Sequence, residues 1–144
     1  KFKPDLFIVD LNLKLKKKLF LNKIIKKRRT YLITYKKNFK KTDIFKKKGY
    51  KIIFVNSLNS KKDFYLLFNK IFKLGYSRVL IETGLIFLKT ILKYKIANDL
   101  YLFKKKNKLN NDGKNNISSN FIKKIKFKQI QMNLDTDNLL IKKF

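Results

Sequence analysis

The chain of 144 residues has no cysteine, no histidine and no tryptophan. Without cysteine it forms no disulfides, and without cysteine and histidine the usual structural zinc sites and the zinc-dependent deaminases are excluded. Nucleophilic catalysis by cysteine and acid–base catalysis by histidine are excluded for the same reason. The sequence therefore offers no metal site and no catalytic residue of these common kinds.

Long apolar runs are also missing. None reaches the roughly 20 residues that a membrane-spanning helix needs, and residues 1–5 do not form a secretory signal. We therefore expect a cytoplasmic protein that has no membrane partner. Apolar residues make up 44% of the chain, which is enough for a single folded domain over residues 1–144.

Acidic residues are scarce, with 9 against 38 lysines and arginines, which gives a formal net charge of +29. Such an excess favours nucleic acid or another polyanion as a partner. However, only three of the cations are arginine, the residue that grips phosphates and base edges bidentately. Two origins of the charge remain open: a functional basic surface, and an AT-rich genome, whose codons favour Lys, Asn, Ile, Phe and Tyr. Either predicts salt-dependent, non-specific polyanion binding.

Short apolar runs bounded by polar residues predict buried strands over residues 5–10, 30–35, 51–55, 77–81 and 99–103. Apolar residues spaced i, i+3, i+4, i+7 predict one helix over 61–73 and a second from Leu85 to about Lys95. Ser60 is a suitable cap for the first helix, and Gly75 a suitable end.

The remaining segments predict loops and a hairpin. Residues 19–29 indicate a loop or frayed helix, and the Asn- and Ser-rich residues 107–120 indicate a long loop. Residues 127–144 predict an antiparallel hairpin around a turn at 135–138. The alternation of strands and helices predicts an α/β fold: a mostly parallel sheet flanked by helices, with the hairpin as its antiparallel edge.

The most informative segment is the predicted strand at 77–81, the turn Glu82-Thr83-Gly84, and the helix that follows. This order places a helix amino terminus at the carboxyl edge of the sheet, where free N–H groups suit a phosphate. Gly84 lets a phosphate approach the backbone closely, although a plain tight turn has the same pattern. Glu82, the only glutamate, is interpreted either as a salt-bridge partner or as an acceptor for sugar hydroxyls or a pyrimidine N–H.

Residues 74–84, with the sequence LGYSRVLIETG, resemble the reductase domain of the bifunctional riboflavin-biosynthesis deaminase–reductase. That family carries a Gly, a Ser, three hydrophobic residues, Glu, Gly or Ala, and Gly in this region. Residues 88–100 resemble the family's leucine-rich stretch, with Ile96 to Leu100 at its Val-Asp-Glu-Leu. Residues 4–15 resemble its segment of Pro, hydrophobic residues, Asp and alternating Leu, with the same spacing between all three blocks.

This resemblance implies a dihydrofolate-reductase-like fold and an NADPH-dependent oxidoreductase. It would reduce 5-amino-6-ribosylamino-pyrimidine phosphate to the ribitylamino product, with the hydride supplied by NADPH. By matching position, Glu82 would contact the substrate. The cofactor would lie, largely on backbone N–H groups, against Leu11, Gly84, Leu85, Ile86, Phe87, Leu88, Lys89 and Thr90. Leu11 stands where the family often has Ser, and Thr83 where it has Gly or Ala.

The resemblance also implies partners. We expect a homodimer, and a longer native protein whose upstream segment carries the family's S-L-D-G motif and an additional deaminase domain. Two other functions remain open. One is a basic, ribosome-associated nucleic-acid-binding protein, which needs aromatic rings exposed beside lysines such as the triplets at 16–18, 46–48 and 104–106. The other is a non-catalytic domain that dimerises through the edge of its C-terminal hairpin.

Overall fold

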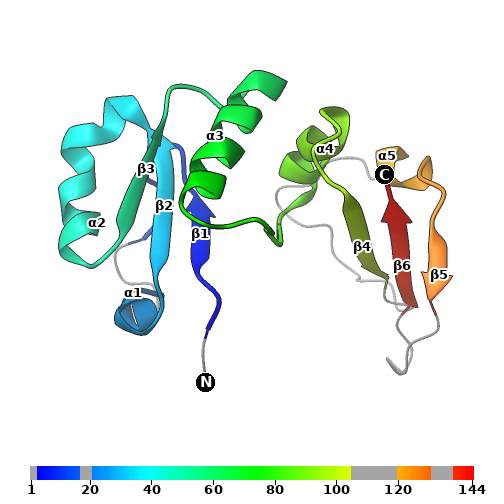
Figure 1. Cartoon of the computed structure of the whole chain (residues 1–144), viewed down its shortest axis with the longest axis horizontal. Helices are drawn as coiled ribbons and strands as arrows, with labels where there is room; N and C mark the ends of the chain where they lie inside the picture. The colour runs from blue at the N-terminus through cyan, green and yellow to red at the C-terminus, as the bar shows by residue number, and fades with distance from the viewer. Residues whose placement is uncertain (1–2, 17–20, 105–119, 131–137) are drawn as a thin grey trace. The chain divides into compact units, whose positions relative to one another are not determined.

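The computed structural model describes residues 3–16, 21–104, 120–130 and 138–144. The chain divides into two compact units, an amino-terminal unit of Lys1–Ser77 and a carboxyl-terminal unit of Arg78–Phe144. Together they contain a three-stranded parallel sheet with helices and a separate three-stranded antiparallel sheet, so the chain belongs to the α/β class (Figure 1). That all 144 residues act as one domain stays a prediction.

The amino-terminal unit is built on three parallel strands in the order β1-β2-β3. They are β1 (Leu6–Val9), β2 (Thr30–Tyr35) and β3 (Lys51–Val55). All three lie where the apolar runs predict them. The central strand β2 is buried from Thr30 to Thr34, as expected for a parallel strand that is covered on both faces.

Short helical segments connect these strands on one face of the sheet. They are α1 (Leu21–Ile24), η1 (Ile25–Lys27), η2 (Lys36–Thr42) and α2 (Asp43–Lys47). Their apolar side chains Ile25 and Phe45 form a core cluster with Leu32 and Tyr50. A loop or a frayed helix was expected at 19–29, and the structure has the short helices α1 and η1 there. The helical course of residues 36–47 was not predicted.

The opposite face is covered by α3 (Lys61–Lys73), which lies across the sheet from α2 (Figure 1). Its buried residues Phe64, Leu67 and Ile71 recur with helical spacing, as the sequence predicts. After α3 the chain turns at Gly75, whose φ of 95° favours glycine.

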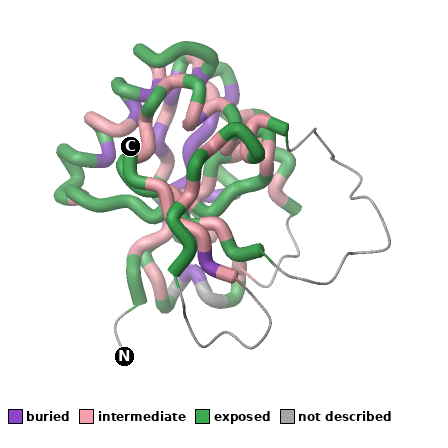
Figure 2. Tube along the Cα trace, turned by 90° about the vertical axis from the view of Figure 1, so that its right-hand side faces the viewer, coloured by how far each residue is buried: buried purple, intermediate pink, exposed green. Residues whose placement is uncertain are grey.

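The described residues of the carboxyl-terminal unit include two helices, α4 (Leu85–Lys93) and α5 (Asn120–Lys123). Its strands β4 (Asp99–Lys104), β5 (Lys128–Ile130) and β6 (Asn138–Lys143) form an antiparallel sheet in the order β4-β6-β5. Most of this unit's described residues remain partly or fully exposed (Figure 2). The helix predicted from Leu85 is confirmed, although it ends at Lys93.

The antiparallel hairpin β5–β6 is confirmed, but its predicted place is wrong. It does not extend the parallel sheet, because β6 pairs with β4 along Asp99–Lys104. With β5 on its other side, β6 has no free edge to offer the parallel strands. The hairpin therefore completes a second sheet.

The predicted buried strand at 77–81 is also wrong. These residues have no strand structure, and the side chain of Leu80 is 81% exposed. A strand forms where its backbone groups find a neighbouring strand, and residues 77–81 pair with neither sheet. Consequently α4 does not follow a sheet strand, as the strand–turn–helix interpretation required.

Two predictions lie mainly outside the described residues. They are the loop at 107–120, of which only Asn120 is described as the start of α5, and the turn at 135–138, of which only Asn138 is described. Among the helices of the described residues, none combines the length and the apolar character required to cross a bilayer.

Candidate functional site

The first candidate site is the start of α4. The helix begins at Leu85, directly after Gly84, as predicted. Gly84 has ordinary extended backbone angles, φ −74° and ψ 168°, so no left-handed conformation requires glycine here. A Cβ placed on Gly84 would meet no atom within 4 Å beyond its chain neighbours. The space in front of this turn is therefore open to a ligand.

The amino terminus of α4 has no side-chain cap, and its first turn contains no acidic residue. The first hydrogen bond within the helix runs from the Leu88 N–H to the Gly84 carbonyl, at 3.1 Å. The N–H groups of Leu85 and Ile86 precede that bond and have no acceptor in the preceding helical turn. They lie at the positive end of the helix dipole.

The predicted cofactor residues of α4 divide by exposure. Ile86 and Lys89 are exposed, whereas Leu85, Phe87 and Leu88 are half-buried. The half-buried Thr90 donates its hydroxyl to the Ile86 carbonyl at 3.1 Å. Its hydroxyl is therefore used inside the helix, which leaves backbone groups as the donors of the first turn.

Glu82 and Leu11, the other predicted contacts, lie in different units. Glu82 is exposed just before α4, and within the described parts of the chain it forms no ion pair. Leu11 follows β1 in the amino-terminal unit. Its carbonyl accepts hydrogen bonds from Thr34 Oγ1 at 3.0 Å and Asn38 Nδ2 at 2.8 Å. This carbonyl joins the end of β1 to the start of η2, a role that the sequence did not reveal.

A second candidate site lies at the carboxyl edge of the parallel sheet. An open depression of about 460 Å³ is lined by polar and basic residues that follow β2 and β3: Tyr35, Lys36, Lys37, Asn56, Ser57 and Asn59. Ligands of open α/β sheets bind at this edge. Polar residues follow both strands in the sequence, but only the pairing of β2 with β3 shows that they lie together, so this site was not predicted.

The amino terminus of α3, next to this depression, is closed by its own side chains. Ser60 Oγ accepts the Asp63 N–H at 3.2 Å, and the Asp63 carboxylate accepts the N–H groups of Asn59 and Ser60 at 3.0 and 2.9 Å. Hydrogen bonds from Ser57 and from these neighbours lower the pKa of Asp63 to about 2. With a carboxylate already in place, this helix end does not attract a further anion.

A polar cluster occupies the opposite, amino-terminal edge of the same sheet. The Tyr76 hydroxyl donates a hydrogen bond to Asp5, which also pairs with Arg29 at 3.5 Å. Partial burial and the Asp5 contact raise the pKa of Tyr76. Phe7 stacks on Tyr31 with ring centroids 4.5 Å apart, and Tyr76 meets Phe7 edge-on at 5.0 Å. The cluster anchors the chain that leaves α3 to the start of β1.

The chain matches no protein-family model, and the search of curated proteins found no match. The fold and composition define a basic protein of the α/β class. A more specific function is therefore a matter of proposal, drawn from the residues themselves.

Proposed function

We propose that the chain is the cofactor-binding part of a dihydrofolate-reductase-like, NADPH-dependent reductase of riboflavin biosynthesis. The observation that carries the proposal is the uncapped amino terminus of α4, which directly follows the turn Glu82-Thr83-Gly84. It coincides with the residues through which the chain resembles the reductase domain. The substrate is 5-amino-6-ribosylamino-pyrimidine phosphate, which is reduced to its ribitylamino form.

The residues at this turn suit a phosphate of NADPH. The N–H groups of Leu85 and Ile86 donate hydrogen bonds to it, and the helix dipole adds a partial positive charge. The open space at Gly84 admits the phosphate close to the backbone. Lys89, exposed one turn further along α4, adds a full positive charge nearby. NADPH supplies the hydride when it is bound.

The chain's own residues bind and orient the substrate. Glu82 is exposed and makes no ion pair within the described residues, so its carboxylate is available to accept hydrogen bonds from the ribose hydroxyls or a pyrimidine N–H. Because the sequence has no histidine or cysteine, no proton transfer is assigned to a side chain of this chain. The chain's excess of lysine favours NADPH over NADH in a general way, because NADPH carries an additional 2′-phosphate.

The test replaces Gly84 with two residues of equal shape, Gly84→Asp and Gly84→Asn. Both cap a helix well, and the backbone angles at Gly84 accept either. Only aspartate places a negative charge where the phosphate binds. We expect NADPH affinity to fall at least about tenfold in the aspartate variant relative to the asparagine variant, measured by fluorescence titration at about 0.2 M salt.

Two controls accompany this titration. NADH reports whether the 2′-phosphate contributes, and Glu82→Ala should leave NADPH affinity unchanged while it weakens binding of the pyrimidine substrate. NADPH affinity equal to that of the native chain in both the Gly84→Asp and the Gly84→Asn variants, with circular dichroism showing both folded, would exclude the α4 amino terminus as the cofactor site.

A further inference from the structure

The helical crossover between β2 and β3 concentrates the chain's charge. Seven of the 13 residues from Lys36 to Lys48 are lysine, and Asp43 is the only acidic residue among them. Asp43 forms an ion pair with Lys46 at 3.0 Å, so it offsets little of this charge. The share of cationic residues in this segment is higher than in the whole chain, where lysine and arginine together make up 38 of 144 residues.

The crossover holds these lysines on a fixed scaffold. Asn38, Thr42 and Phe45 are buried and turn inward at spacings of four and three residues. Asn38 Nδ2 donates to Thr34 Oγ1 at 3.0 Å, and Thr42 Oγ1 donates to the Phe39 carbonyl at 2.6 Å. Because the inward residues are anchored, the remaining side chains are presented together on the outer face.

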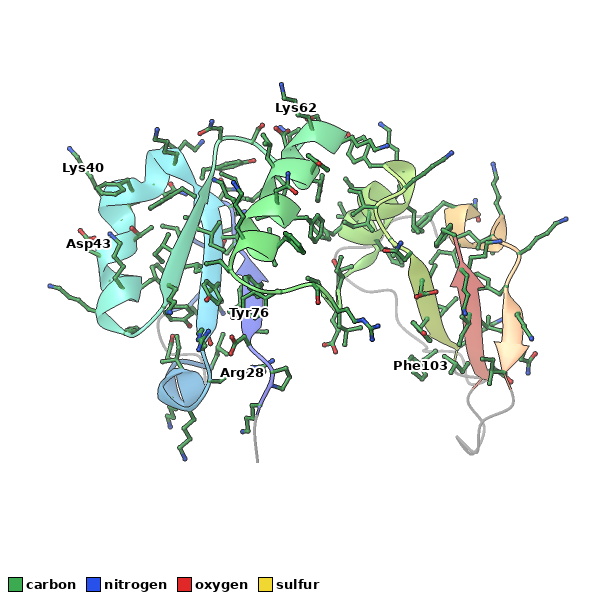
Figure 3. All side chains as sticks on the ribbon, in the orientation of Figure 1. Arg28, Lys40, Asp43, Lys62, Tyr76 and Phe103 are labelled. Atoms are coloured by element: carbon green, nitrogen blue, oxygen red, sulfur yellow. The ribbon has the colours of Figure 1, made fainter. Side chains whose placement is uncertain are left out.

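An aromatic ring stands among these cations. Phe39 is 57% exposed, and its ring lies 4.8 Å from Lys46 Nζ and 5.6 Å from the ring of Phe54. Figure 3 shows Lys40 and Asp43 on the side of the crossover that faces away from the sheet. Asp43 and Ile44 are also exposed here. We call the exposed lysines and the ring of this crossover the lysine face: Lys36, Lys37, Phe39, Lys40, Lys41, Lys46 and Lys47.

We propose that the lysine face binds single-stranded nucleic acid. The lysines contact successive phosphates, and one base stacks on Phe39 after Lys46 moves from the ring to a phosphate. Proteins that hold single strands without sequence preference combine basic surfaces with exposed aromatic rings in this way. The lysine face contains no arginine, and lysine is a point charge without arginine's bidentate fork, so binding is independent of base sequence.

The aromatic ring favours a single strand over other anionic partners. A duplex keeps its bases stacked inside, so Phe39 has no base face to meet. An acidic protein surface supplies charge without a planar partner for the ring. A bilayer is disfavoured because Phe45 is turned into the core, and the two exposed apolar residues of the crossover, Phe39 and Ile44, stand among lysines, which leaves no wide apolar stripe.

The experiment measures binding of a labelled oligouridine of about 12 nucleotides by fluorescence anisotropy between about 0.05 and 0.2 M salt. The test variant is Lys40→Gln, Lys41→Gln, Lys47→Gln. The matched control is Lys61→Gln, Lys62→Gln, Lys73→Gln, which removes the same charge from exposed positions of α3 in the same unit. Glutamine keeps helix propensity close to that of lysine.

We expect the lysine-face variant to bind at least about tenfold more weakly, with the slope of log K against log salt reduced by about 2, from 0.7 for each lost phosphate contact. The α3 control should change affinity less than about threefold. Equal weakening in both variants would overturn the proposal, because it would show that total charge alone attracts the strand.

A second pair of variants tests the stacking. Phe39→Leu removes the ring but keeps an apolar side chain, and its matched control is Phe72→Leu, because Phe72 is 66% exposed on α3. Phe39→Leu should weaken oligouridine binding about fivefold or more, and the control should not. Equal affinity of the native chain for a duplex of the same length, or for vesicles containing phosphatidylserine, would reject the single strand as partner.

This inference is independent of the reductase proposal. The lysine face lies in the amino-terminal unit, whereas the predicted NADPH contacts from Gly84 to Thr90 lie in the carboxyl-terminal unit. The Gly84→Asp variant should bind oligouridine as the native chain does. A chain that binds oligouridine but not NADPH refutes only the cofactor site.

Discussion

The helices α3 and α4 have similar amphipathic sequences but begin in opposite ways. At α3, Ser60 and Asp63 form a reciprocal capping box, and three apolar residues are buried along one face. At α4, Gly84 offers no cap, and Ile91 is the one fully buried residue of the helix. The comparison separates two uses of a helix amino terminus. One is closed by the chain and serves stability, while the other stays open to an anion.

The packing of α3 against the core should give the largest measurable effect. Phe64 is 1% exposed in the core beneath α3, and replacing it with alanine should lower the free energy of unfolding by about 3–5 kcal/mol. Tyr65→Ala, one position along and 67% exposed, should cost less than about 0.5 kcal/mol. Urea unfolding followed by circular dichroism measures both. Similar losses in the two variants would mean that α3 does not bury the face assigned to it.

The cap of α3 should give the next largest effect. Ser60→Ala removes the acceptor of the Asp63 N–H and should cost about 1 kcal/mol of unfolding free energy. The matched change before α4 is Thr83→Ala, which should cost almost nothing, because among the described residues the hydroxyl of Thr83 bonds just to the adjacent Gly84 carbonyl, at 3.3 Å. If Thr83→Ala were as costly as Ser60→Ala, then α4 would have a cap of its own and the comparison would fail.

Features encoded by nearby residues, such as those of α3, were predicted correctly, whereas features that depend on residues distant in the sequence were missed. Helix α3 could be predicted to the residue because its apolar spacing, its cap and its terminal glycine all indicate the same boundaries. The crossover from Lys36 to Lys47 was missed because two of its three inward residues, Asn38 and Thr42, are polar. Burial of Asn38 depends on a hydrogen bond to a residue distant in the sequence, the Leu11 carbonyl. No local sequence pattern predicts such a bond.

The predicted strand at 77–81 failed for a related reason. Val79, Leu80 and Ile81 have the composition of a buried strand, but burial requires a neighbouring strand, and composition does not specify one. For the candidate site, the start of α4 and the position of Gly84 could be predicted because a helix start is a local feature. The depression beside Lys36 and Lys37 could be found only once β2 and β3 were known to be neighbours.

The pH dependence of stability should also distinguish the two helix ends, by a smaller effect than the cap substitutions. The pKa of Asp63 is lowered to about 2 from an ordinary 3.8, so the unfolded chain binds the proton more readily. Its contribution to stability is therefore complete above about pH 4 and is lost as the pH falls toward 2. Asp63→Asn should flatten this part of the pH–stability curve. The first turn of α4 contains no acidic residue, so that helix has no matching carboxylate. A curve for Asp63→Asn that still falls between pH 4 and 2 as steeply as that of the native chain would contradict the assignment.

The smallest effect should come from closing the open helix. Gly84→Asn adds the side-chain cap that α4 lacks, in a backbone conformation that asparagine accepts without strain. It should stabilise α4 by only a few tenths of a kcal/mol, which is best seen as slower amide hydrogen exchange in residues 85–88. Exchange within α3 should not change, because its amino terminus is already closed by Ser60 and Asp63. Unchanged or faster exchange at the start of α4 would mean that its N–H groups already have acceptors. In that case the helix end would have no donors left for a phosphate, and the contrast with α3 on which the cofactor proposal depends would disappear.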